Sequence, residues 1–281
     1  MHILGWLKNR FTDLKYFSWL AKKRYFLPHF LVYWILYPIP RLLLGRKKAP
    51  DVSGRIISYF KDKNLIIPLP INNPCYIGLR DAVDFNAFRE VCIEDHYNFL
   101  QLKLGMIIVD IGAHIGTFTL LASKIVGEQG KVIAIEPEVH NFEQLKINLE
   151  LNRIKNVVPV NVALSDFNDK KDFFITKGSG CHSFSPMPGE KIIDKIQVNV
   201  KTLDTLLQEL NISKIDLIKI DAEGAEISVL KGAEKTLRAN PHIKIIVAAE
   251  HYPSQVEEVC SFLNKKAFKT KILKDNIVAI V

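Results

Sequence analysis

Two acidic residues stand at the ends of successive apolar runs, where a small ligand could be held. Asp110 ends the run MIIVD, and two glycines, Gly112 and Gly116, follow it. Glu136 ends the next run, KVIAIE. Runs of this kind are typical of strands buried on both faces of a parallel sheet. Because such sheets bind ligands beyond the carboxyl ends of their strands, the two acids predict a ligand site.

The glycine spacing discriminates between possible ligands. A nicotinamide fingerprint needs G-x-G-x-x-G, and Ile111 and His114 occupy positions where it requires glycine. No Lys-Ser/Thr pair follows, which excludes a P-loop. The remaining pattern, D-x-G-x-x-x-G, favours S-adenosylmethionine. We expect Asp110 to organise the loop and hold the methionyl ammonium, directly or through water, and Glu136 to accept both ribose hydroxyls. The alternative is that the glycines only permit a tight turn.

Later strand ends carry residues for proton transfer. The run IDLIKID places Lys219 and Asp221 on one face, with Glu223 just beyond. A charged pair at a buried strand end is costly unless it is hydrogen-bonded or functional. We expect Asp221 to be a base or an acceptor-orienting group, and Lys219 to hold its charge or bind substrate. Glu250 and His251 end the next run, and an imidazole exchanges protons near neutral pH. Structural roles as an ion pair or as caps are the alternatives.

For these candidate residues to lie at strand ends, strands must alternate with helices along the chain. We expect buried strands over residues 106–110, 131–136, 157–164, 215–221 and 243–250, and helices over 117–126, 138–151, 202–210, 225–239 and 254–267. A hairpin-like insertion is expected at about 171–200, and a final hairpin turns at 274–276. This alternation predicts an α/β protein with a mostly parallel sheet. Residues 1–50 form an extension, 51–105 short strands and a helix, and 106–281 the main domain.

Several segments resemble the FkbM-type S-adenosylmethionine-dependent methyltransferases, from about Tyr76 to the C-terminus. They include the glycine loop VDIGAHIG, NVALSD, VKTLDTLL, and most specifically KIDAEGAE with LKGA. The resemblance implies a class I methyltransferase sheet, Rossmann-like with a C-terminal antiparallel hairpin, and methyl transfer to an oxygen, commonly a hydroxyl of a sugar or natural product. Within the loop, Ala113 and His114 are further cofactor candidates; the His114 side chain either touches the methionyl carboxylate or is exposed.

The sequence differs from many class I enzymes at the position expected to contact adenine. An acid often follows the third strand, but here the matching stretch is Asn161, Val162 and Ala163. We therefore expect adenine to be read by backbone groups or by Asn161. Asp166 could serve if the loop folds back, and its alternative role is a helix N-cap.

The first 50 residues differ from the rest in charge. They hold ten Lys or Arg, one acid and all three tryptophans; since the chain carries +8, the other 231 residues carry −1. An uncharged run from Tyr25 to Pro40 is too short and too proline-rich for a spanning helix, and no secretory cleavage site follows. We expect residues 1–48 to form a helical, aromatic segment that docks on an anionic membrane surface. Packing on its own domain or on a second copy in a homo-oligomer is the alternative.

The overall expectation is a cytoplasmic, peripherally membrane-associated enzyme that O-methylates a saccharide, glycolipid or lipid-linked glycan. The four cysteines are scattered without zinc spacing, which fits a reducing compartment. An RNA methyltransferase is one rival, but a near-neutral catalytic domain disfavours nucleic acid. A non-catalytic binding subunit is another. Asp221, Glu250 and His251 could gather a divalent metal; the family resemblance does not imply one, and we expect none.

Overall fold

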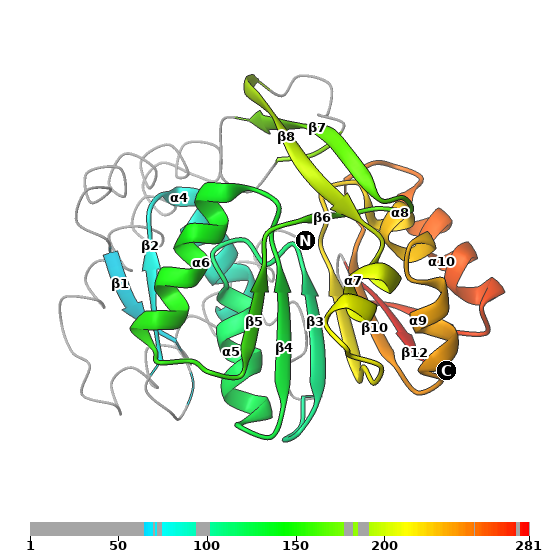
Figure 1. Ribbon diagram of the computed structural model, residues 1–281, viewed down its shortest axis with the longest axis horizontal. Coiled ribbons are helices and arrows are strands. Elements are labelled where there is room, and N and C mark those ends of the chain that lie inside the picture. Colours follow the sequence, from blue (N-terminus) through cyan, green and yellow to red (C-terminus); the bar gives the residue numbers. More distant parts are fainter. Residues whose placement is uncertain are drawn as a thin grey trace, which may run out of the picture. The chain divides into compact units, whose positions relative to one another are not determined.

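The computed structural model describes residues 65–69, 71, 75–93, 102–176, 182–184, 191–249, 251–273 and 276–280 (Figure 1). The chain divides into two units, Met1–Asp95 and His96–Val281, and each is described by itself. Residues 1–50, including the expected membrane-docking segment, lie outside the described residues. Within the described ranges, no helix is both long and apolar enough to cross a bilayer.

The described part of the first unit contains a short hairpin and a helix. Strand β1 (Leu65–Pro68) pairs antiparallel with β2 (Tyr76–Leu79). Helix α4 (Ala82–Phe88) begins where the Asp81 carboxylate accepts two backbone N–H groups, and it continues as a π-helical turn, η2 (Arg89–Ile93). Short strands and a helix are expected from the sequence within residues 51–105, and β1, β2 and α4 lie there; the stretch from 94 to 101 lies outside the described residues.

The second unit is built on a seven-stranded sheet in the order β11-β12-β10-β9-β3-β4-β5. Its strands are β3 (Ile107–Ile111), β4 (Lys131–Ile135), β5 (Val157–Val160), β9 (Leu217–Ile220), β10 (Lys244–Ala248), β11 (Lys269–Leu273) and β12 (Asn276–Ile280). The pairs among β10, β9, β3, β4 and β5 are parallel, whereas β12 pairs antiparallel with both β10 and β11. The predicted mostly parallel sheet with a C-terminal hairpin is confirmed.

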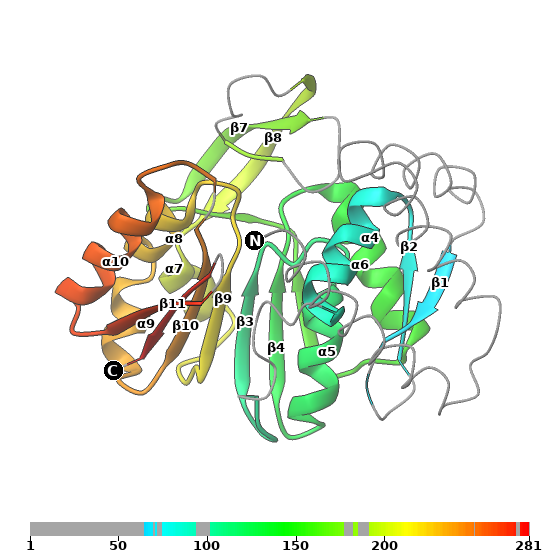
Figure 2. The same ribbon diagram turned by 180° about the vertical axis from the view of Figure 1, so that it is seen from behind.

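Six helices in the described part of this unit cover the two faces of the sheet. They are α5 (Thr117–Val126), α6 (Val139–Leu151), α7 (Leu203–Glu209), α8 (Glu226–Lys231), α9 (Glu234–Ala239) and α10 (Gln255–Lys265). Helices α5 and α6 lie on one face and α7 to α10 on the other (Figures 1 and 2). The apolar strand side chains are buried beneath them, which explains why the central runs are continuous rather than alternating.

The helix predicted over 225–239 is in fact two, α8 and α9, separated at Gly232 and Ala233. A Cβ atom on Gly232 would lie 2.1 Å from the carbonyl oxygen of Ser165. The backbone of α8 therefore approaches the segment after β6 more closely than any side chain permits. This contact gives a packing reason for the glycine of LKGA.

The predicted strand over 157–164 also divides. Its first half is β5, and its second half is β6 (Ala163–Leu164), which pairs with a different, three-stranded sheet. That sheet is completed by β7 (Asp169–Thr176) and β8 (Ile192–Lys201), an antiparallel pair that corresponds to the expected insertion. Both views place this β7–β8 arm beyond the carboxyl ends of β3, β4 and β5 (Figures 1 and 2).

Candidate active site

The loop after β3 lies against the end of β9. Gly112 has φ +74°, and a Cβ atom there would lie 1.8 Å from the carbonyl oxygen of Asp221. The N–H groups of Gly112 and Ala113 both donate to Ile135 O at 3.0 Å, which ties the loop to the end of β4. Gly116, at φ +90°, stands before α5, and a Cβ atom there would clash with Leu145. Both loop glycines thus adopt a positive φ, and at Gly112 the close approach of the Asp221 backbone also excludes a side chain.

Asp110 is fully buried beneath this loop. Its carboxylate accepts a hydrogen bond from Thr119 Oγ1 at 2.5 Å and pairs with Lys219 Nζ at 3.3 Å. The two charged residues are direct register partners on β3 and β9. This position supports the expectation that Asp110 organises the loop, while its contact with a cofactor ammonium stays a prediction.

Lys219 connects the loop to the catalytic candidates. Its ammonium donates to Gly112 O at 2.8 Å and lies 3.5 Å from Asp221 Oδ2. Burial opposes its charge, but the carboxylates of Asp110 and Asp221 outweigh burial, and the pKa of Lys219 lies above its ordinary value. The side chain is 4% exposed, so it is placed to hold the charge of Asp221 rather than to reach a substrate.

Glu136 follows β4 and faces the loop. One carboxylate oxygen accepts the N–H of His114 at 2.8 Å, and the other accepts the N–H of Glu138 at 3.0 Å. Desolvation by burial raises the pKa of Glu136 to about 7, against the opposing effect of these two hydrogen bonds. His114 adopts φ +52°, a left-handed conformation that is uncommon for a residue with a side chain.

The residues expected near adenine have structural partners. The Asn161 amide donates to Glu136 O at 2.8 Å and Pro137 O at 3.0 Å, so its hydrogens join the ends of β4 and β5. Ala163 begins β6 and packs in the core of the small sheet. Asp166 is followed by the strand β7, so the helix-cap alternative is wrong. Adenine recognition by Asn161 or by nearby backbone stays a prediction.

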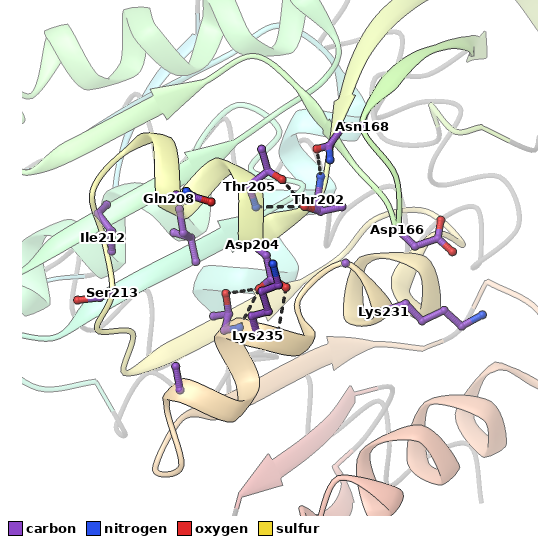
Figure 3. A pocket seen from close by; sticks show the side chains of 14 residues that line it. Asp166, Asn168, Thr202, Asp204, Thr205, Gln208, Ile212, Ser213, Lys231 and Lys235 are labelled. Carbon is purple, nitrogen blue, oxygen red and sulfur yellow. Dashed lines mark hydrogen bonds between the residues drawn. The ribbon is translucent and has the colours of Figure 1, made fainter.

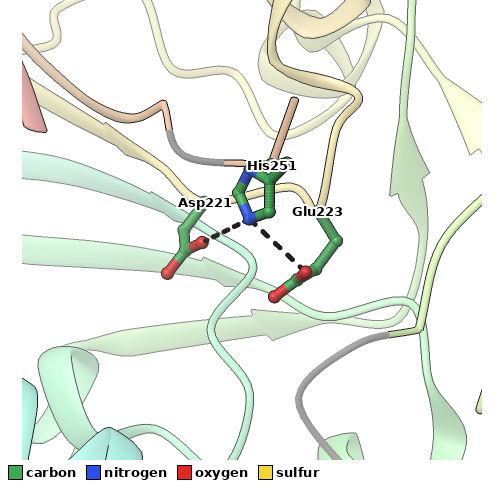
Figure 4. A group of neighbouring side chains, drawn as sticks. All are labelled: Asp221, Glu223 and His251. Atoms are coloured by element: carbon green, nitrogen blue, oxygen red, sulfur yellow. Dashed lines mark ion pairs between the residues drawn. The ribbon is translucent and has the colours of Figure 1, made fainter. Parts of the chain in front are cut away.

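The acidic and imidazole candidates gather at the carboxyl ends of β9 and β10 (Figure 4). His251 Nε2 lies 3.4 Å from Glu223 Oε2 and 3.9 Å from Asp221 Oδ1. The two carboxylate side chains are 29% and 30% exposed, while the imidazole is 8% exposed. The cluster is therefore open on its carboxylate side, where a polar molecule can enter. Glu250 lies outside the described residues.

Two further residues complete this cluster and were not singled out from the sequence. Glu226 is fully buried, and its Oε1 lies 3.3 Å from His251 Nδ1. Gln255 accepts the backbone N–H of His251 at 2.8 Å and donates to Glu226. Burial raises the pKa of Glu226, and the charge of His251 opposes this. Their spacing in the sequence could have indicated these two residues, because Glu226 follows Asp221 by five residues and Gln255 follows His251 by four.

A separate groove of about 490 Å³ lies among residues of α7 and α9 (Figure 3). Its polar groups are largely engaged in joining elements: Asp204 accepts the N–H groups of Lys235 at 2.9 Å and Thr236 at 2.8 Å. Thr202 N–H donates to Asn168 at 2.9 Å. Asp166, which the sequence offered for adenine, lines this groove, whereas the predicted residues of the glycine loop and of the ends of β4, β9 and β10 are not among its described lining residues.

Comparison with known proteins gives the site a context. Residues 110–270 match the sequence profile of the Methyltransferase FkbM domain. Hexuronic acid methyltransferase AglP of Haloferax volcanii is 26% identical over 174 residues, 59% of this chain and 65% of that protein. Methyltransferase 1 of Beauveria bassiana is 27% identical over 164 residues, 52% of this chain and 66% of that protein. The chain thus spans just under two thirds of either relative.

A solved structure shares the fold. The crystal structure of Methyltransferase FkbM from Methylobacillus flagellatus has a TM-score of 0.50 and 17% sequence identity, covering 66% of this chain and 46% of that one. At this identity, the likeness shows the architecture alone.

Proposed function

The chain belongs to the FkbM methyltransferase family, and on that premise we propose that it O-methylates a hydroxyl of a saccharide, a glycolipid or a lipid-linked glycan. The observation that carries the proposal is the group of Asp221, Glu223 and His251 at the strand ends, directly beside the glycine loop. The name of one relative, a hexuronic acid methyltransferase, supports a saccharide acceptor.

S-adenosylmethionine is the cofactor of the family, as the sequence predicted. The residues present fit it. A side chain at Gly112 would collide with the Asp221 carbonyl oxygen, so glycine lets the loop keep its place beside the end of β9. Thr117 Oγ1, at the start of α5, is buried and has no hydrogen-bond partner among the described residues, so it can accept or donate to a ligand. Glu136 would hold the ribose hydroxyls, and residues 112–117 would surround the methionyl part.

When bound, S-adenosylmethionine supplies a methyl group on a sulfonium, and the acceptor oxygen takes that methyl while losing its proton. The task of this chain is to aim the hydroxyl and to receive the proton. His251 Nε2 stands between two carboxylates that are both partly exposed. A sugar presents neighbouring hydroxyls, so one can face Nε2 while Asp221 and Glu223 accept hydrogen bonds from others. The Lys219 ammonium, 3.5 Å from Asp221, places a positive charge beside that carboxylate.

The proposal is tested by the fate of a labelled methyl group. The full-length protein is incubated with methyl-labelled S-adenosylmethionine and a cell lysate, and the label is partitioned among lipid, glycan, RNA and protein. We expect label in glycan or glycolipid that survives mild alkali, because an ether is stable and a methyl ester is hydrolysed. The Asp221→Asn variant provides the matched background. Label in RNA or protein, or label released by alkali, contradicts the proposal.

A further inference from the structure

Glu226 is a buried carboxylate that the proposed reaction does not yet use. It is 0% exposed and accepts the N–H groups of Ala222 at 2.9 Å and Gly224 at 3.3 Å. Gln255 donates to its other oxygen. A buried charge is retained only where such partners offset its desolvation, and the fourth partner of Glu226 is the imidazole of His251.

Gln255 fixes how the imidazole meets this carboxylate. The amide oxygen of Gln255 accepts His251 N–H at 2.8 Å, which leaves its nitrogen on the side of Glu226. The His251 ring nitrogen Nδ1 therefore has two neighbours: Gln255 Nε2 at 3.4 Å and Glu226 Oε1 at 3.3 Å. A hydrogen bond with Gln255 Nε2 would require Nδ1 to accept, whereas a hydrogen bond with Glu226 Oε1 would require Nδ1 to donate.

The charge of Glu226 decides which of these two hydrogen bonds His251 Nδ1 makes. A hydrogen bond to an ionised partner is roughly twice as strong as one between neutral groups. The Gln255 nitrogen already donates to Glu226, whereas water does not reach the carboxylate to replace a lost donor. The hydrogen of a neutral His251 imidazole is therefore more stable on Nδ1, because the hydrogen bond made by one ring nitrogen sets the tautomer of the ring.

We infer that Glu226 is a positioning residue, which holds the His251 hydrogen on Nδ1 so that Nε2 receives the proton of the acceptor hydroxyl. The inference rests on the function proposed above and assigns the base within it. The bonds balance: the acceptor oxygen forms a bond to the methyl carbon, the methyl–sulfur bond breaks with its electron pair passing to sulfur, and the hydroxyl proton passes to Nε2. The resulting imidazolium faces Glu226 on one side and Glu223 on the other.

The tautomer of His251 is measured directly by ¹⁵N NMR of the imidazoles in the cofactor-free, full-length protein at the pH of the activity assay. The His251→Gln variant assigns the signal. We expect the hydrogen on Nδ1 in the wild-type protein and a shift of population towards Nε2–H in Glu226→Gln, which keeps the shape and removes the charge. A hydrogen on Nε2 of the wild-type protein, alone or together with one on Nδ1, overturns the inference.

Kinetics provide a second readout. Glu226→Gln should lower kcat by between about 10²- and 10⁴-fold, the usual contribution of a correctly oriented base, and leave KM within a few-fold. In a His251→Ala background, Glu226→Gln should lower kcat no further, because it acts through the imidazole. An undiminished effect in that background overturns the inference.

A fold control separates positioning from stability. Asp204→Asn removes a carboxylate that joins α7 to α9 without contacting the cluster. It should lower the melting temperature and leave both the tautomer and kcat unchanged. Since the NMR measurement needs no acceptor, its outcome is independent of whether a saccharide proves to be the substrate. A fall in kcat for Asp204→Asn as large as for Glu226→Gln would assign Glu226 a purely structural role and overturn the inference.

Discussion

The backbone of Gly112 lies so close to Asp221 that a Cβ atom on the glycine would stand 1.8 Å from the Asp221 carbonyl oxygen. The loop after β3 and the cluster that contains Asp221 therefore share one backbone contact. Lys219 reinforces it by donating to Gly112 O at 2.8 Å and pairing with Asp221 at 3.5 Å. A shift of the backbone at Gly112 therefore also displaces the backbone at Asp221.

Gly112→Ala should therefore weaken both cofactor binding and turnover. Alanine at φ +74° is strained, and its methyl group cannot be accommodated without moving the loop. We expect S-adenosylmethionine affinity to fall at least 10-fold in calorimetry. Gly105→Ala, at φ +79° but with no atom near its Cβ, controls for backbone strain alone and should bind normally. Equal losses in the two variants would show that strain, not the contact, is responsible.

Glu136→Ala should weaken S-adenosylmethionine binding by about 10- to 150-fold, because a charge-assisted hydrogen bond contributes roughly 1.5–3 kcal/mol. Calorimetry measures the change. Glu138→Ala removes a neighbouring carboxylate that caps α6 and should cost stability rather than affinity. Unchanged affinity in Glu136→Ala would place the ribose elsewhere.

The raised pKa of Glu136 predicts a pH dependence of stability. Its folded-state pKa of about 7 exceeds the ordinary value of 4.5, so the folded protein holds this proton more tightly than the unfolded chain. The resulting stabilisation is present below about pH 4.5 and is lost as the pH rises through about 7. The melting temperature of Glu136→Gln, measured without cofactor, should rise relative to wild type between pH 5 and about 7.5. A constant difference across that range would show that Glu136 titrates normally.

Asp221→Asn should abolish turnover while cofactor affinity stays within a few-fold, since its carboxylate is partly exposed on the acceptor side. Single-turnover rates and calorimetry on the same preparations measure both. Parallel loss of binding and activity would assign Asp221 to the cofactor site. If Asp221→Asn retains activity while His251→Ala loses it, His251 alone carries out the acceptor chemistry.

Turnover should not require a metal ion. Ligand atoms of Asp221, Glu223 and His251 lie within 4.8 Å of one another, which is compatible with a divalent cation. The Lys219 ammonium, 3.5 Å from Asp221, already supplies a positive charge there. We expect equal rates with EDTA and with added Mg²⁺ or Mn²⁺. Loss of activity in EDTA that Mn²⁺ restores would show that a metal ion, rather than a side-chain base, activates the acceptor hydroxyl.

We also propose that residues 1–48 dock the enzyme on anionic membrane. Their ten basic side chains and three tryptophans suit the headgroup region. Flotation with anionic liposomes should carry the full-length protein upward and leave a chain that starts at Pro50 behind, whereas neutral liposomes should carry neither. Failure of the full-length protein to float would contradict the proposal.

The sequence predicted the parts of this fold that depend on local pattern. The apolar runs ending at Asp110 and Glu136 became β3 and β4, because burial on both faces leaves no polar alternation. The break at Gly232 was missed because its cause, the approach to Ser165, lies far away in the chain. Glu226 and Gln255 were overlooked as site residues for the same reason: their contact joins α8 to α10.

In the described part of the chain the β7–β8 arm pairs with the strand β6 through two residue pairs, and Phe173, Val198 and Val200 form a small apolar cluster with Ala163 of β6. An arm attached in this way can be exchanged as a unit. Residues 169–201 could be exchanged for the corresponding segment of another family member with little disturbance of β3 or β9, which hold the cofactor loop and Asp221. Such an exchange would change the surface beyond the carboxyl ends of β3, β4 and β5 while leaving the methyl-donor site in place.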